Sequence, residues 1–246
     1  MFTKHLYDTH VHTIETSPCG KLHAAETVEW YASHGYTGLV ITDHLHKQFL
    51  ETAGADHGWD ILIDKYCAGY RAALQKGNEI GFKVIFGAEM RFEDNDNDYL
   101  IYGIDENWLR QHPYVICQSA RDFFQKYHND VLIIQAHPYR DGNINVFEDS
   151  IHGIELINTN RRHNNYPDRA LDLCKKHPEY FRQAGSDTHR AEDRCLAGIE
   201  TEQNIHDSFE FADLIRSGNY CLYAPDFPQY VEEDRQLRGV KSNNIQ

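Results

Sequence analysis

Short runs rich in apolar residues recur along the chain and alternate with longer segments in which apolar residues return every three or four positions. Runs of four or five such residues, bounded by polar ones, predict β-strands covered on both faces. They lie at residues 6–9, 38–42, 83–86, 99–103, 131–135, 153–157 and 181–184. We therefore expect a sheet at the centre of the fold.

The segments between these runs carry the spacing of amphipathic helices. One apolar face predicts a helix over residues 24–33 that stops at Gly35, since glycine is favoured just past a helix end. A second stripe, from Leu62 to Leu74, predicts a helix that ends at Gly77. Further helices are expected at 119–127, 167–176 and 207–216, and the polar tail from about residue 230 is expected to be frayed.

Residue types that bind metals stand where the predicted strands end. His10 and His12 project to the same face of the first strand, because side chains alternate along a strand. Later strands run into Asp43-His44, Glu89, His137-Pro138 and Asp187-Thr188-His189. Imidazole and carboxylate are ligands that zinc, manganese and iron accept. The strand ends together predict one shared metal site, and Pro138 is expected to hold the backbone of His137 extended.

The alternation of strands and helices predicts a mostly parallel sheet in a single α/β domain over residues 1–246. A closed or nearly closed barrel accounts for the candidate ligands better than an open doubly wound sheet. An open sheet binds its ligands at one switch point, whereas a barrel gathers the loops of all its strands at their carboxyl ends.

Composition narrows the class of protein. The chain has 24 Lys and Arg against 38 Asp and Glu, a net charge of −14, so we expect no nucleic-acid polymer as a partner. Its six cysteines form no Cys-x-x-Cys pair, which is typical of a reduced, cytoplasmic protein. A candidate site residue as early as Asp8 leaves no room for a signal peptide, and no apolar run approaches the ~18 residues of a membrane span. No pattern predicts the oligomeric state.

The joint order of the strand-end residues resembles the PHP superfamily, named for its polymerase and histidinol phosphatase domains. The resemblance implies a distorted (β/α)7 TIM-like barrel and a metal-dependent phosphoesterase that acts on a small phosphorylated substrate. It also implies two or three divalent ions (Mn, Fe or Zn). One ion would be held by His10, His12, Glu89 and Asp187, a second by Glu89 and His137, and a third by His44 and His189.

Two positions depart from the family pattern. Cys19 stands in the loop where the family commonly has His or Asp, and Asp105 follows the strand after which relatives often carry His. Both are candidate ligands, and without them a two-metal enzyme remains. The acidic stretch 93–98 lacks the glycine and the final acid of a calcium loop, so we expect a turn there.

Catalytic roles are expected for Arg140, Asp187 and His189. Arg140 follows His137 closely enough to contact a phosphate oxygen, and Arg161, Arg162 and Arg190 are weaker candidates for the same role. An exposed surface position is the alternative for each arginine.

Two competing functions share the metal site. An amidohydrolase-type enzyme would need a further His at a strand end between His137 and Asp187, and His163 is the nearest candidate. The other alternative is a non-catalytic, metal-binding PHP module. Within the phosphoesterase hypothesis, the residues do not separate histidinol phosphate from a nucleotide or a cyclic phosphodiester.

Overall fold

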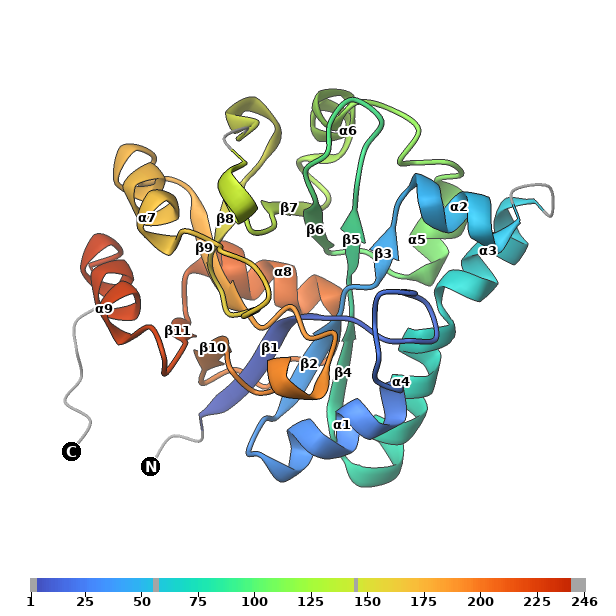
Figure 1. The fold of residues 1–246 in the computed structure, drawn as a ribbon, viewed down its shortest axis with the longest axis horizontal. Helices are drawn as coiled ribbons and strands as arrows, with labels where there is room; N and C mark the ends of the chain where they lie inside the picture. The colour runs from blue at the N-terminus through green and yellow to red at the C-terminus, as the bar shows by residue number, and fades with distance from the viewer. Residues whose placement is uncertain (1–3, 55–57, 144–145, 240–246) are drawn as a thin grey trace.

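The computed structural model describes residues 4–54, 58–143 and 146–239. Strands occupy its centre and helices surround them (Figure 1). All seven predicted strands are confirmed, and four short strands add to them. The strands are β1 (His5–Val11), β2 (Gly38–Ile41), β3 (His44–Leu45), β4 (Lys83–Phe86), β5 (Ala88–Met90), β6 (Tyr99–Tyr102), β7 (Leu132–Gln135), β8 (Gly153–Asn158), β9 (Phe181–Gly185), β10 (Gly198–Thr201) and β11 (Cys221–Tyr223).

The helices predicted at 24–33, 119–127, 167–176 and 207–216 are confirmed. The α-helices are α1 (Ala24–Ser33), α2 (Lys47–Ala53), α3 (Trp59–Tyr66), α4 (Ala68–Ile80), α5 (Glu106–Gln111), α6 (Ala120–Tyr127), α7 (Pro167–Lys176), α8 (Ser208–Ser217) and α9 (Pro228–Leu237). Short 3-10 turns lie at Arg140–Gly142, Glu148–Ser150 and Ala191–Asp193.

The strands form two mixed sheets. One has the order β11-β10-β1-β2-β4, and the other has the order β3-β5-β6-β7-β8-β9. The predicted parallel pairing holds for β1 with β2, for β2 with β4, and for β7, β8 and β9. It is wrong for β6, which runs antiparallel to both of its neighbours. The unpredicted β10 is also antiparallel to its neighbours, β1 and β11.

A closed barrel is not confirmed, because the described strands form two sheets rather than one ring. The sheets adjoin where the backbone N–H of Glu89 donates to the carbonyl of Asp43 at 3.1 Å. A second contact joins β1, the middle strand of the first sheet, to the chain beyond β9 through an isolated bridge between Val11 and Thr188. Asp187 has a φ of 54°, so the chain leaves the extended conformation just after β9 and the ladder ends there.

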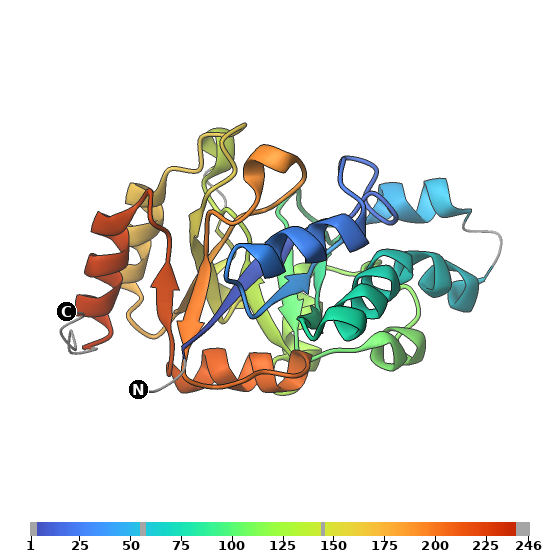
Figure 2. The ribbon, with the colours of Figure 1, turned by 90° about the horizontal axis from the view of Figure 1, so that it is seen from below.

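Both sheets cover one apolar core. Fully buried side chains reach it from each sheet: Tyr7, Val40 and Ile85 from the first, and Leu100, Ile134 and Ile154 from the second. α8 lies across one end of the strands, and the loops of residues 12–22 and 186–195 lie at the other end (Figure 2). The site described below lies at the end that carries these loops.

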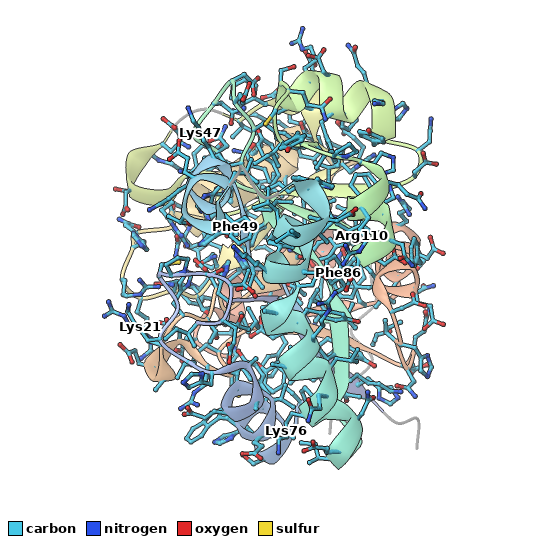
Figure 3. All side chains as sticks on the ribbon, turned by 90° about the vertical axis from the view of Figure 1, so that its right-hand side faces the viewer. Lys21, Lys47, Phe49, Lys76, Phe86 and Arg110 are labelled. Carbon is cyan, nitrogen blue, oxygen red and sulfur yellow. The ribbon has the colours of Figure 1, made fainter. Side chains whose placement is uncertain are left out.

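The stripe from Leu62 to Leu74 belongs to two helices, α3 and α4, which meet at Cys67. The predicted stop at Gly77 is wrong. Gly77 packs so closely on β4 that a Cβ there would lie 2.7 Å from the Phe82 carbonyl oxygen, and α4 ends instead at Gly81, whose φ is 76°. On the face shown in Figure 3, Arg110 of α5 joins this helix pair through an ion pair with Asp64 at 2.7 Å.

The expectation of a frayed tail from about residue 230 is wrong as far as Leu237, because the chain there forms α9. This helix lies beside α7 and β11 (Figure 1). Its Asp234 is fully buried and pairs with Arg182 of β9 at 2.8 Å. Residues 240–246 of the tail lie outside the described residues. In the described part of the chain, no helix is long and apolar enough to cross a membrane.

Candidate metal centre

Seven of the nine predicted metal ligands converge at the loop-bearing end of the strands. β1 carries His10 and leads into His12, and both side chains are 0% exposed. β3 and β5 pair in register, which places His44 opposite Glu89. The seven residues are His10, His12, His44, Glu89, His137, Asp187 and His189.

Glu89 lies in the middle of this cluster, and its two oxygens face different imidazoles. Oε1 lies 3.1 Å from His137 Nε2 and 3.3 Å from His10 Nε2. Oε2 lies 2.8 Å from His44 Nδ1 and 3.3 Å from His12 Nε2. A carboxylate that faces two sets of donors in this way is suited to join two neighbouring cations.

Asp187 closes the cluster from the chain beyond β9. Its Oδ1 lies 3.2 Å from His12 Nε2 and 3.2 Å from His189 Nδ1, and its Oδ2 accepts a hydrogen bond from Arg140. Asp187 and His137 have φ angles of 54° and 29°, respectively, so the predicted extended backbone of His137 is wrong. Such strained conformations are kept where the surrounding contacts fix them, and they gather at functional sites.

The donors fit a metal centre. Ligand atoms lie within 4.8 Å of one another in three overlapping groups: His12, His44 and His189; His10, His12 and Glu89; and Glu89, Asp98 and His137. Among the described residues, His12 Nδ1, His44 Nδ1 and Glu89 Oε2 are buried and have no hydrogen-bond partner, although the last two are 2.8 Å apart. Buried polar atoms are rarely left unpaired, so these atoms fit a site that binds a cation.

The electrostatics agree with this reading. Burial favours a raised pKa for Glu89 and for Asp187, but His10 beside Glu89 and Arg140 beside Asp187 hold both pKa values well below the usual range. Burial also favours a lowered pKa for His10, yet the surrounding carboxylates raise it well above the usual value. Protonated imidazoles therefore offset the negative charge of these carboxylates, and bound cations would offset that charge in place of the protons. By contrast, burial and the neighbouring His189 lower the pKa of His12, which leaves it a neutral ligand.

Glu155 of β8 belongs to the candidate site, and the sequence analysis missed it. It is 1% exposed, and its Oε1 accepts a hydrogen bond from His10 Nδ1 at 2.9 Å. Its Oε2 accepts from the backbone N–H of His137 at 3.0 Å and from Asn158 Nδ2 at 2.8 Å. The bond to Nδ1 leaves His10 Nε2 facing the cluster, an arrangement typical of metal-binding histidines. A buried acid within an apolar strand was the available signal.

The expectation that Asp105 is a ligand is wrong. Its Oδ1 accepts from the backbone N–H of Trp108 at 2.7 Å and caps α5. Because β6 runs antiparallel to β5 and β7, its carboxyl end lies away from the cluster. Its amino end brings in Asp98 instead, whose Oδ2 lies 3.9 Å from His137 Nε2 and which pairs with Arg91 at 2.8 Å. The turn predicted at 93–98 is confirmed, but its last residue belongs to the site.

Cys19 lies beside the cluster, as the sequence predicts. Its thiol lines the same cleft as His189 and His44, and both imidazoles act on it electrostatically. Burial favours a raised pKa for the thiol, but these two imidazoles outweigh burial and lower the pKa of Cys19 to about 6. A thiolate at this position is therefore accessible near neutral pH.

A cleft of about 360 Å³ opens onto the cluster, and three arginines line it: Arg91, Arg140 and Arg162. Arg140 is held by Asp187 and by two asparagines, with 3.1 Å to Asn158 Oδ1 and 3.0 Å to Asn165 Oδ1. Arg161 pairs with Asp226 at the surface, and Arg190 is exposed. His163 also lines the cleft, but it pairs with Asp141 at 2.7 Å and belongs to none of the three ligand groups.

A family model described as the PHP domain matches residues 8–186. No curated protein matches the sequence. Residues 8–186 include every candidate ligand except Asp187 and His189, which follow the matched segment by one and three positions.

Several solved structures share the fold. A two-domain protein from Bacteroides vulgatus, described as containing a predicted PHP-like metal-dependent phosphoesterase, has a TM-score of 0.65 at 13% identity over 94% of this chain and 70% of that one. PsfC from Pseudomonas syringae has a TM-score of 0.61 at 14% identity over 97% and 100% of the two chains. An amidohydrolase from Chromobacterium violaceum with bound sulfate and no metal has a TM-score of 0.52 at 15% identity over 91% and 99%. At these identities the comparisons establish the fold alone.

Proposed function

Because the chain belongs to the PHP domain family, we propose that it is a metal-dependent phosphoesterase that hydrolyses a small phosphorylated substrate. The proposal depends on one observation above all: the histidine and carboxylate cluster opens into a cleft lined by Arg91, Arg140 and Arg162. Guanidinium groups pair well with phosphate oxygens. The three arginines therefore place positive charge in the cleft of a chain whose net charge is −14.

We assign the ligands to three positions. His10, His12, Glu89 and Asp187 would hold one divalent ion. Glu89 and His137 would hold a second, with Asp98 in place of the expected Asp105. His44 and His189 would hold a third. Divalent ions of this kind, when bound, make water a nucleophile near neutral pH and offset charge on the phosphoryl oxygens.

The protein's own side chains would place the substrate. Arg140 would bind a phosphoryl oxygen from a fixed position, because Asp187, Asn158 and Asn165 hold its guanidinium. Asp187 would therefore act twice, as a ligand through Oδ1 and as the anchor of Arg140 through Oδ2. His189 is 6% exposed and lines the cleft, so it would contribute to catalysis beside the substrate.

The amidohydrolase alternative has less support from this site. It would require His163 as a ligand, and that side chain pairs with Asp141. A non-catalytic module also fits less well, because the histidine and carboxylate set around Glu89 is mostly intact and its ligand atoms lie close together.

Replacing Glu89 provides the test. Protein purified without chelators is analysed for metal content and assayed with a generic aryl phosphate monoester and diester. We expect two to three equivalents of metal and turnover of one ester. Glu89→Gln should lose metal and lower activity by more than about 100-fold, since its two oxygens face both sets of donors.

Glu51→Gln is the matched control, because Glu51 is exposed on α2, and it should leave both readouts unchanged. An active and fully metallated Glu89→Gln protein would contradict the proposed site. Full metal occupancy without hydrolysis of either ester would contradict the reaction.

A further inference from the structure

A second cavity, of about 590 Å³, adjoins the arginine-lined cleft of the candidate site. Arg91 and Asp96 line both the cleft and this cavity, so the two meet at these residues. Its volume lies within the range of about 300–1,000 Å³ that is usual for pockets that bind small molecules. The roles assigned so far lie in the cleft and leave this cavity without one.

Three segments enclose the second cavity: the start of α2, the stretch after β5 and the segment before α6. Hydrogen bonds hold these segments together. The backbone N–H of Arg91 donates to the carbonyl of Leu45, two residues before α2, at 3.3 Å, and the backbone N–H of Glu93 donates to the carbonyl of Gln118 at 3.2 Å. The cavity is therefore a fixed part of the fold.

Arg91 links the second cavity to the candidate metal centre. Its Nε donates to Asp98 Oδ1 at 2.9 Å, and its Nη2 donates to Asp98 Oδ2 at 2.8 Å. Asp98 in turn belongs to the ligand group of Glu89 and His137. A phosphate ester bound at that group would therefore have its alcohol part beside Arg91, at the entrance to the cavity.

Buried apolar side chains and more exposed polar ones line the second cavity. Leu50, Phe92 and Ile116 supply the apolar part, and all three are buried. The polar part offers both hydrogen-bond donors and acceptors: Lys47, Arg91 and Asn95 carry N–H groups, and Glu93, Asp94 and Asp96 carry carboxylates. Lys47 lies at the start of α2 (Figure 3).

An alcohol rich in hydroxyl groups matches this lining. A hydroxyl both donates and accepts hydrogen bonds, so neighbouring hydroxyls pair with the carboxylates and with the N–H groups together. The carbon skeleton of such an alcohol would pack on Leu50, Phe92 and Ile116. A second phosphate group matches less well, because the carboxylates of Glu93 and Asp94 would repel it.

We propose that the second cavity binds the alcohol part of the substrate, and that this alcohol is a sugar or a similar hydroxyl-rich compound. The inference rests on the proposed phosphoesterase function and adds the class of substrate to it. Hydrolysis would consume one water and release the free alcohol and inorganic phosphate. Arg91 and Asp96, where cleft and cavity meet, would contact both parts of the ester.

Protection of Cys117 tests binding without turnover. This thiol is exposed and lines the second cavity, so a bound sugar should slow its reaction with N-ethylmaleimide. We expect glucose 6-phosphate at ten times its Kd to slow the reaction about 10-fold, measured by mass spectrometry of the Cys117 peptide. Ethyl phosphate, also the ester of a primary alcohol, should give no protection. Cys221 of β11 lines neither the cleft nor the cavity and serves as the internal control.

Kinetics with the same two esters test the effect of the cavity on specificity. We expect kcat/KM to be about 10–100-fold higher for glucose 6-phosphate than for ethyl phosphate, as two additional hydrogen bonds would give. Cys117→Trp fills the cavity and should bring this ratio close to one. Gln125→Trp is the matched control, because it adds the same side chain at an exposed position of α6, and it should keep the ratio.

The outcomes separate the cavity from the reaction. Equal protection of Cys117 by both esters, or a ratio that Cys117→Trp leaves unchanged, would overturn the assignment of the cavity. Stronger protection by 2-aminoethyl phosphate than by glucose 6-phosphate would overturn the hydroxyl-rich class. Protection by glucose 6-phosphate without hydrolysis of either ester would support the cavity and contradict the proposed reaction. Hydrolysis of both esters without protection would support the reaction and contradict the cavity.

Discussion

Glu155 holds two candidate ligands, His10 and His137, from outside the cluster. One of its oxygens accepts from His10 Nδ1, and the other accepts from the backbone N–H of His137 and from Asn158. A carboxylate accepts all of these bonds at once, and no other residue type of the same shape does so. The buried acid therefore fixes the ring orientation of His10 and the position of the strained His137 backbone together.

Replacing Glu155 with glutamine should weaken metal binding while the fold persists. Glutamine has one accepting oxygen, so either His10 Nδ1 or His137 N–H meets an amide donor and one bond is lost. We expect an affinity loss of about 10–100-fold, measured by competition with a chromogenic chelator.

Glu148→Gln serves as the control for Glu155→Gln, because Glu148 is exposed on the turn before β8. An unchanged metal affinity in a folded Glu155→Gln protein would show that Glu155 does not orient the ligands.

At the scale of elements, α9 is held by a buried ion network rather than by a long apolar stripe. Asp234 forms an ion pair with Arg182 of β9 at 2.8 Å and a second ion pair with Arg238, the residue that follows α9. The Arg182 side chain is also buried, with 3% exposed. The polar composition of this segment predicts a frayed tail, yet one of its polar residues, Asp234, attaches the helix to the rest of the fold.

Asp234→Ala should cost about 3–5 kcal/mol of unfolding free energy, because it leaves the Arg182 guanidinium buried without its carboxylate. Urea denaturation followed by circular dichroism measures the loss. Glu232→Ala, at an exposed position two residues earlier on the same helix, should change stability by less than about 0.5 kcal/mol. Equal effects of the two substitutions would mean that α9 docks without the buried pair.

The direction of β6 is the element-scale feature that decides which acid reaches the site. Asp98 and Asp105 flank the same strand, and the parallel arrangement expected from the alternation of elements places Asp105 at the cluster. The antiparallel pairing of β6 places Asp98 there instead. The direction of a strand depends on its neighbours in the sheet, so the spacing of residues along β6 does not predict that direction.

At the scale of the whole molecule, the fold buries several negatively charged side chains close together in the cluster. Four buried carboxylates (Glu89, Asp98, Glu155 and Asp187) lie among histidines within a chain of net charge −14. Bound cations would reverse the local sign and join β1, β5 and β7 with the segment after β9. Metal binding and global stability are therefore expected to be linked.

Metal removal should lower the thermal midpoint of unfolding. At a metal concentration 100 times the Kd, binding to the folded state contributes about 2.7 kcal/mol, which for a chain of this size corresponds to a shift of roughly 5–10 °C. Differential scanning calorimetry of chelator-treated protein, with and without added zinc or manganese, measures the shift. Identical midpoints under all conditions would argue against a resident metal.

The sequence by itself determined the chemistry of the site and most of the elements. Side-chain alternation along a strand places His10 and His12 on one face, and apolar runs followed by His, Asp or Glu mark the strand ends, because both are local properties of a few neighbouring residues. The same local patterns identified Glu89, His137 and Asp187 as members of one cluster, whereas Cys19 became a candidate only through the resemblance to the PHP superfamily.

Only the tertiary structure decided how these pieces meet. The reversal of β6, the separation into two sheets, the docking of α9 through Asp234 and the approach of Glu155 to His10 all join residues far apart in the chain. Such contacts depend on which strand pairings and packings bury the whole chain best. No short stretch of sequence records that global balance, so Asp98 and Glu155 became visible only in the fold.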